Sequence, residues 1–250
     1  MPKKGDITKC ENYRTISLIN HSSKVLLEII RSRMKPYVET ILAEEQAAWG
    51  LRPGRSTVEQ VSALTLLIQH RLEKKDGKVF AVFIDYKKAF DRVWHDGLFI
   101  VLQHYGVPQK LINIIRDLCN KAQSCIRLNN NLTEWFETKI GVRQGCLLSP
   151  DLFNLFLENI LAEAFEDCKN LGINVDGYKL KDLRFADDIA LITDTEDNLQ
   201  TLIKRVHDVS KEYGMEISIP KTKAKISSRE DQLKVNIKLD GTSLEQVKQI

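Results

Sequence analysis

The sequence has few cysteines, no long hydrophobic run and no linker-like composition. Its 250 residues contain five cysteines, none of them in a Cys-x-x-Cys pair, which argues against a disulfide framework or a zinc site. No apolar run reaches the roughly 18 residues of a membrane helix, and the start lacks the apolar core of a signal peptide. With 43% hydrophobic and 28% charged residues, the composition excludes a disordered chain and indicates one large or two small globular domains.

The net charge is close to zero, but the charges are distributed unevenly. The chain has 37 Lys and Arg against 34 Asp and Glu, a formal charge of +3. Residues 1–40 carry eight basic and four acidic side chains, whereas residues 151–200 carry four basic and twelve acidic ones. This division is typical of a protein that contacts a polyanion with one part and a metal with another. Ordinary variation of a protein surface is the simpler explanation.

The pattern of hydrophobic residues predicts helices and strands that do not alternate regularly, which favours an α+β fold. Helices are expected over residues 18–42, 58–73, 96–105, 108–120, 150–168 and 196–213. The first contains Pro36, a residue type that kinks or splits helices, and Thr57 suits the N-cap of the second.

The expected strands are short, with one exception. A continuous apolar run over residues 79–84 predicts a strand that is buried on both faces. Hairpins are expected over 124–139 and 183–193, the second turning at the Asp187-Asp188 pair. The last part of the chain, 215–250, predicts further short strands.

Three aspartates stand at the ends of apolar strands. Asp85 ends the run 79–84, and Asp187 and Asp188 lie at the tip of the second hairpin. A carboxylate in such a place must be solvated, paired or bound to a cation, and adjacent aspartates repel unless a positive charge holds them. Together the three are hard oxygen ligands suited to Mg²⁺ or Mn²⁺, and two such ions about 4 Å apart support phosphoryl transfer. A simple turn is the alternative for the Asp-Asp pair.

Six segments occur in one order along nearly the whole chain, and as a set they carry a specific signal. They are Asn12-Tyr-Arg-Thr-Ile-Ser-Leu18, Leu51-Arg-Pro-Gly-Arg-Ser-Thr57, Phe83-Ile-Asp-Tyr-Lys-Lys-Ala-Phe-Asp-Arg-Val93, Gly141-Val-Arg-Gln-Gly-Cys-Leu-Leu-Ser-Pro150, Phe185-Ala-Asp-Asp188 and Gly214-Met-Glu-Ile-Ser-Ile-Pro-Lys-Thr-Lys223. The series resembles two finger motifs and motifs A, B, C and D of the reverse transcriptases of non-LTR (LINE-type) retrotransposons.

The resemblance implies the fingers and palm of a right-hand polymerase, with an antiparallel palm sheet backed by helices. Residues 1–78 are then expected to form the fingers region and 79–250 the palm region, with inserted finger elements at about 120–150. The chain is expected to stop at Ile250, before the thumb. We expect an RNA-directed DNA polymerase that uses two Mg²⁺ (or Mn²⁺) ions, an RNA template, a DNA primer and dNTPs. The remainder of a retrotransposon polyprotein, with its thumb and endonuclease, is an expected partner; a membrane is not.

The resemblance also implies roles for the catalytic residues. Asp85 and Asp187 match metal-binding aspartates, and Asp188 matches an acid that supports the same site. Lys221 matches the lysine proposed to protonate the leaving pyrophosphate, and Lys223 is close enough to be its alternative.

Further residues match positions that contact the nucleotide or the nucleic acid. Phe90 matches an aromatic steric gate against the ribonucleotide 2′-hydroxyl, and the backbone amide of Tyr86 matches a triphosphate contact. The expected nucleotide-binding residues are Tyr86, Phe90, Gln144, Gly145 and Arg52. The expected nucleic-acid-binding residues are Lys24, Arg55 and Arg143. For Phe90 a place in the core is the alternative, and for the last three a solvated surface position is.

Two other function classes stay open at this point. One is an inert or domesticated fragment that binds nucleic acid without turnover, which the expected loss of the thumb favours. The other is an RNA-directed RNA polymerase with the same palm chemistry, against which Phe90 and the Phe-Ala-Asp-Asp hairpin argue. The host, the retrotransposon clade and the localisation do not follow from the sequence.

Overall fold

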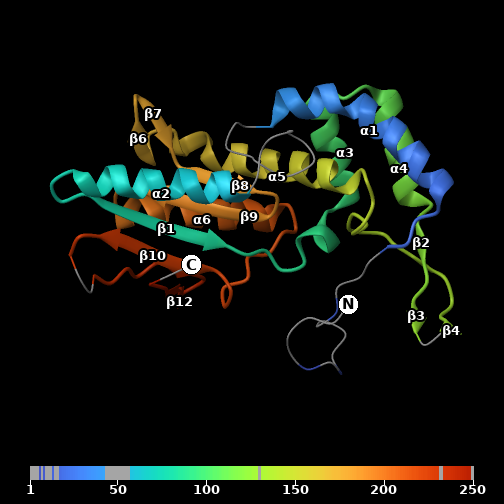
Figure 1. Ribbon diagram of the computed structural model, residues 1–250. Helices are drawn as coiled ribbons and strands as arrows, with labels where there is room; N and C mark the ends of the chain where they lie inside the picture. Colours follow the sequence, from blue (N-terminus) through green and yellow to red (C-terminus); the bar gives the residue numbers. More distant parts are fainter. Residues whose placement is uncertain are drawn as a thin grey trace. The chain divides into compact units, whose positions relative to one another are not determined.

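The structure of the protein, a computed structural model, describes residues 6, 8, 13, 17–42, 57–128, 131–230 and 233–248. The chain divides into two compact units, one of residues 1–40 and 90–153 and the other of residues 41–89 and 154–250. Helices and antiparallel strands occur together without regular alternation, which confirms the predicted α+β class (Figure 1).

A five-stranded sheet forms the centre of the second unit, in the order β13-β10-β1-β9-β8 (Figure 1). Its strands are β1 (Lys78–Ile84), β8 (Asp182–Phe185), β9 (Asp188–Thr193), β10 (Lys223–Ser228) and β13 (Glu245–Gln246). All neighbours are antiparallel except β10 and β13. Because β1 pairs with β9 on one side and β10 on the other, the strand that leads to Asp85 is the middle of the sheet.

Strand β1 is buried on both faces, as its apolar run predicts. Val79 and Ala81 lie on the face that packs against helix α2 (Thr57–Glu73), in a core that includes Leu67. Alternation along the strand turns Val82 and its neighbours two residues away to the opposite face. Helix α6 (Glu196–Glu212) contacts β1 and β9 there. The two helices therefore enclose the strand that carries Asp85.

Four further elements belong wholly or largely to the second unit. Helix α5 (Ser149–Phe165) continues into the 3₁₀ turn η3 (Glu166–Cys168), so the helix expected over 150–168 changes type in its last turn. The strands β6 (Ile173–Val175) and β7 (Tyr178–Leu180) form a hairpin that the sequence pattern did not predict. Its strands are only three residues long, too short for hydrophobic alternation to stand out.

The first unit contains mainly helices. They are α1 (His21–Ile41), α3 (His95–His104) and α4 (Gln109–Asn120), with the 3₁₀ turn η2 (Ala89–Arg92) before α3. The predicted start of α1 at residue 18 is wrong, because the Asn20 side chain accepts a hydrogen bond from the Ser23 amide (2.7 Å) and caps the helix there. The helix is not split at Pro36. The expected hairpin over 124–139 consists of four two-residue strands: β2 (Gln123–Ser124), β3 (Arg127–Leu128), β4 (Asn131–Leu132) and β5 (Phe136–Glu137).

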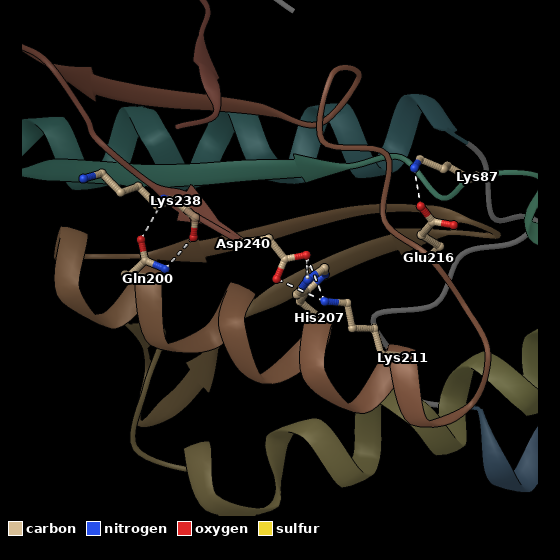
Figure 2. A network of polar contacts seen from close by, with 7 residues as sticks. All are labelled: Lys87, Gln200, His207, Lys211, Glu216, Lys238 and Asp240. Atoms are coloured by element: carbon tan, nitrogen blue, oxygen red, sulfur yellow. Dashed lines mark hydrogen bonds and ion pairs between the residues drawn. The ribbon is translucent and has the colours of Figure 1, made fainter. Parts of the chain in front are cut away.

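Side chains of α6 hold the short strands that follow β10 (Figure 2). The strands β11 (Lys238–Leu239) and β12 (Thr242–Ser243) form a hairpin whose turn carries Asp240. Gln200 donates to the Lys238 carbonyl (2.9 Å) and accepts from its amide (2.8 Å), so it satisfies the edge of β11. Asp240 contacts His207 Nε2 (3.1 Å) and Lys211 Nζ (2.9 Å). The short strands expected over 215–250 are thereby confirmed.

Two further properties of the described part of the chain bear on the sequence predictions. Within these residues no helix is long and apolar enough to cross a lipid bilayer. Cys119, Cys125, Cys146 and Cys168 are free thiols.

We predict that Asp151, in the first turn of α5, makes folding stability fall with rising pH. Burial raises its pKa to about 6, although Arg31 Nε donates to its carboxylate at 3.1 Å and opposes the shift. The folded state therefore binds the extra proton between about pH 4 and pH 6, and ionisation in that window costs about 2 to 3 kcal/mol. Urea unfolding of wild type and Asp151→Asn measures this cost. Between about pH 4 and pH 6, the free energy of unfolding of wild type should drop by about 2 to 3 kcal/mol relative to that of the variant. A constant difference would contradict the prediction.

Candidate active site

Asp85 follows the last residue of β1 and is held through its main chain. Its amide donates to the Thr222 hydroxyl (3.3 Å), and its carbonyl accepts from the Ser218 amide (2.7 Å). One residue further on, Tyr86 bridges to Ile217. The segment from 214 to 223 therefore lies beside the strand end that carries Asp85, and it fixes the backbone from which the carboxylate extends.

The hairpin of β8 and β9 turns at Ala186 and Asp187. Phe185 pairs with Asp188 across the turn, so Asp188 is the first residue of β9. The prediction that Asp187 and Asp188 form the turn is wrong by one residue, because the ladder extends one pair further toward the tip. Ala186 has φ of 55°, a value rare outside glycine that the tight turns of two-residue hairpins require at their first central residue.

The register of β1 and β9 brings the three aspartates together. Ile84 is opposite Ile189, so the next antiparallel positions are those of Asp85 and Asp188. Burial raises the pKa of Asp188, and the charges of Asp187 and Asp85 raise it further. The carboxylates of Asp85 and Asp187 are therefore close enough to repel that of Asp188. Three carboxylates gathered at one end of the sheet favour the binding of a cation there.

The donor set of this cluster fits a hard divalent cation. Among the described residues, no group of three or more His, Cys, Asp and Glu side chains is arranged as a metal cage of its own. Mg²⁺ rarely needs such a cage, because it keeps several waters and takes one or two carboxylates together with substrate phosphates. Asp85, Asp187 and Asp188 supply carboxylates of that kind, and all of these ligands are hard oxygen donors.

Lys221, and not Lys223, lies at this cluster. Its Nζ is 3.3 Å from Asp85 Oδ1, and its side chain is 65% exposed. A turn places it: the amides of Lys221 and Thr222 both donate to the Ser218 carbonyl (3.0 and 2.8 Å). Lys223 Nζ instead donates to Glu245 (2.6 Å) and to the Pro220 carbonyl (2.7 Å). Of the two lysines that the motif leaves open, only Lys221 contacts a catalytic candidate in this way.

The Tyr86 side chain lies in the core of its unit. It is 4% exposed, and its hydroxyl shares a hydrogen bond of 2.8 Å with Ser210 of α6. Burial raises the pKa of this phenol to about 12, which keeps it neutral. The structure therefore leaves open only the main chain of Tyr86 for the substrate contact that the resemblance implies, and this contact stays a prediction.

In the other unit, Phe90 is attached to the segment of motif B. Its ring stacks on Phe153 with centroids 4.6 Å apart and an interplanar angle of 15°, and its carbonyl accepts from the Val142 amide (2.7 Å). Gly141 packs so closely on the preceding turn that an added Cβ would lie 2.9 Å from backbone atoms of Asp91. The position therefore admits only glycine, and Phe90 is partly in the core and partly exposed.

The remaining predicted contacts have different surroundings. The Gln144 carbonyl accepts from the Ser17 amide (2.9 Å), and Gly145 has φ of 94°, which glycine adopts without strain. Arg143 is near enough to Cys119 to lower the pKa of that thiol, although burial raises it to about 11. Lys24 is exposed on α1. Arg52 and Arg55 lie outside the described residues.

The predicted site residues thus fall into the two units. Asp85, Tyr86, Asp187, Asp188 and Lys221 belong to the second, and Lys24, Phe90, Arg143, Gln144 and Gly145 belong to the first. The sequence interpretation missed Ser218 and Thr222, which hold the backbone of Asp85. It also missed a buried cluster of Arg184, Asp182 and Glu158 behind the hairpin, whose only signal is an Asp-x-Arg pair in an otherwise apolar strand.

Comparison with known proteins matches residues 1–238 to the family described as reverse transcriptase (RNA-dependent DNA polymerase). The chain belongs to the reverse transcriptase family. A probable RNA-directed DNA polymerase from transposon BS of Drosophila melanogaster is 34% identical over 186 residues, which are 73% of this chain and 19% of that protein. The Pol polyprotein of the type-1 retrotransposable element R2 of Popillia japonica is 28% identical over 89% of this chain and 30% of its own length. These relatives confirm the resemblance to LINE-type reverse transcriptases.

Solved structures confirm the polymerase fold. Telomerase from Candida tropicalis, in complex with a fragment of telomeric RNA, superimposes with a TM-score of 0.64 over 88% of this chain and 36% of that one, at 16% identity. Apo telomerase from the same organism gives the same TM-score at 14% identity, again over 88% of this reverse transcriptase chain. The chain spans less than a third of the curated relatives named above.

Proposed function

We propose that this reverse transcriptase chain copies an RNA template into DNA by adding dNTPs to a primer. In each step the primer 3′-hydroxyl attacks the α-phosphate of a dNTP, a new P–O bond forms, and pyrophosphate leaves. The observation that carries the proposal is the meeting of Asp85 with Asp187 and Asp188 at one end of the sheet. Carboxylates concentrated in this way suit the binding of divalent cations.

Asp85 and Asp187 would hold Mg²⁺ or Mn²⁺, and Asp188 would support them. Two such ions, when bound, activate the hydroxyl and neutralise the charge that develops on the phosphate oxygens. The protein's own task is to hold the carboxylates still, which is favoured by the bonds that the Asp85 main chain accepts from Ser218 and donates to Thr222. Lys221 would give a proton to the leaving pyrophosphate from its place beside Asp85.

The nucleotide would be selected by the segment that follows Asp85 and by motif B. Phe90 would exclude the 2′-hydroxyl of a ribonucleotide by a clash. The Tyr86 amide, Arg52, Gln144 and Gly145 would contact the dNTP. Lys24, Arg55 and Arg143 would contact phosphates of the template and primer, and such contacts weaken with salt. We assign residues 1–78 to the fingers and 79–250 to the palm, with inserted finger elements at about 120–150.

The chain would act as one domain of a larger retrotransposon protein. Its relatives are several times longer, so a thumb and an endonuclease are the parts we expect elsewhere in such a polyprotein. A thumb would add phosphate contacts to the template–primer duplex, and summed phosphate contacts set the affinity for that duplex.

Primer extension tests the proposal directly. The 250-residue chain is incubated with an RNA template, a labelled DNA primer and either dNTPs or rNTPs, first in Mg²⁺ and then in Mn²⁺. We expect extension with dNTPs and at least about 100-fold slower extension with rNTPs. If extension is absent in both metals, the measurement is repeated with a thumb from a relative fused to residue 250. A fused chain that binds the duplex but still adds no nucleotide would contradict the proposal.

A further inference from the structure

Three charged side chains are buried together behind the catalytic hairpin. Arg184 of β8 donates through Nη1 to Glu158 of α5 at 2.9 Å and through Nε to Asp182 of its own strand. The side chains of Arg184, Glu158 and Asp182 are only 5%, 8% and 3% exposed. All three belong to the second unit, and none of them matches a motif role that the sequence suggested.

Stability alone does not account for this cluster. Burial opposes the charge of Arg184, but the two carboxylates more than offset it and raise its pKa above the usual arginine value. All three charged groups also lose most of their contact with water when the chain folds, which costs free energy. Apolar side chains of similar volume often give a core that is at least as stable as a buried ion cluster. The cluster adds directional hydrogen bonds, because the planar guanidinium donates to two partners at set angles.

The position of Arg184 in the sheet shows which part of the chain is fixed by its bonds to Glu158 and Asp182. Strand β8 is at the edge of the sheet and has only β9 as a neighbour. Arg184 is opposite Ile189, and the next pair, Phe185 with Asp188, closes the turn of Ala186 and Asp187. The bond from Arg184 to Glu158 therefore adds a polar attachment to α5, two residues before the turn, to the pairing of β8 with β9 and its packing against α2.

We infer that the cluster of Glu158, Arg184 and Asp182 is a positioning device for the metal-binding hairpin. By attaching β8 to α5, the cluster fixes the register of the hairpin and the position of its turn, so that Asp187 and Asp188 face Asp85. The three side chains are buried and would act through the hairpin. The inference rests on the proposed function in one respect: it takes Asp85 and Asp187 as metal ligands.

Mn²⁺ binding to the full chain, measured by electron paramagnetic resonance of the free ion, tests the inference without turnover. Arg184→Lys keeps the charge but cannot bond both carboxylates in the same way, and Glu158→Gln weakens one bond. We expect each variant to bind Mn²⁺ about 10-fold more weakly, as loss of an outer support of a metal ligand does. In primer extension kcat should fall by a similar factor, with KM for dNTP within about twofold of wild type.

An apolar triple variant separates positioning from stability. Asp182→Leu, Arg184→Met and Glu158→Met together remove every charge of the cluster and should unfold at a urea concentration equal to or above that of wild type. We expect its Mn²⁺ affinity to stay about 10-fold or more below wild type. Glu163→Gln is the matched control on α5, because Glu163 accepts from the Tyr213 hydroxyl (2.7 Å) and has no bond to the hairpin; its Mn²⁺ affinity should be unchanged.

The possible results separate the positioning role of the cluster from the proposed function. A folded triple variant with wild-type Mn²⁺ affinity would overturn the positioning role. Wild-type Mn²⁺ binding no tighter than that of Asp187→Asn would overturn it as well, because the hairpin would then hold no metal. A wild type that binds Mn²⁺ tightly but extends no primer, even when the fused thumb lets it bind the duplex, would overturn the proposed function only.

Discussion

Asp187→Asn is expected to lower kcat for primer extension at least about 1,000-fold, which corresponds to about 4 kcal/mol of transition-state stabilisation. Asparagine keeps the size of the side chain and its fit in the turn, but it removes the negative charge that would hold the cation. The repulsion that raises the pKa of Asp188 would also fall, because Asp187 contributes to it. The hairpin should therefore fold at least as well as in wild type. Single-turnover extension at saturating dNTP measures the loss, and urea unfolding confirms that the fold is kept.

The control for Asp187→Asn is the same substitution in another hairpin. Asp176 is in the turn between β6 and β7, with φ of 48°, a conformation that asparagine tolerates well. Asp176→Asn should extend primers at the wild-type rate. If Asp187→Asn keeps more than about a tenth of the wild-type kcat, the metal site is not centred on Asp187. Asp188→Asn would then be the next variant to measure.

The central strand and its aspartate were predictable because their signal is local and strong. The run 79–84 has no polar residue, so it suits only a strand covered on both faces, and the structure has β1 at Lys78–Ile84. The helix expected over 196–213 begins at Glu196 in the structure, where Thr195 accepts from the Asn198 amide (3.3 Å) and caps it.

The supports of the site were not predictable from the sequence because they are polar groups chosen by tertiary contact. Thr222 and Ser218 hold Asp85 across more than 130 positions of sequence, and neither has a local pattern that names its partner. In the sequence Arg184 is a single charged residue in a strand, and only the structure shows that Glu158 lies beside it. The turn between β8 and β9 was misplaced because Ala186 adopts a positive φ, a conformation that sequence patterns predict for glycine.

Phe90 shows that two interpretations of one residue are compatible. As a core aromatic it stacks on Phe153, and as a steric gate it would need an exposed edge; the residue is half-buried, which excludes neither role. The stacking fixes the ring, and a fixed ring excludes a hydroxyl better than a mobile one. Discrimination between sugars should then depend on the size of residue 90 and on what holds it.

Phe90→Val is therefore expected to reduce the preference for dNTPs over rNTPs by about 10- to 100-fold in kcat/KM, mainly through faster rNTP addition. Loss of the stacked ring should also cost about 1 to 3 kcal/mol of stability, less than for a fully buried phenylalanine. Phe99→Leu is the control, because Phe99 is buried in the same unit beneath Arg116 (4.9 Å) and its loss should lower stability without changing the preference. Equal changes of preference in both variants would mean that loosening of the unit, and not the ring of Phe90, sets the choice of sugar. A changed preference in Phe90→Val alone would assign the gate to that ring.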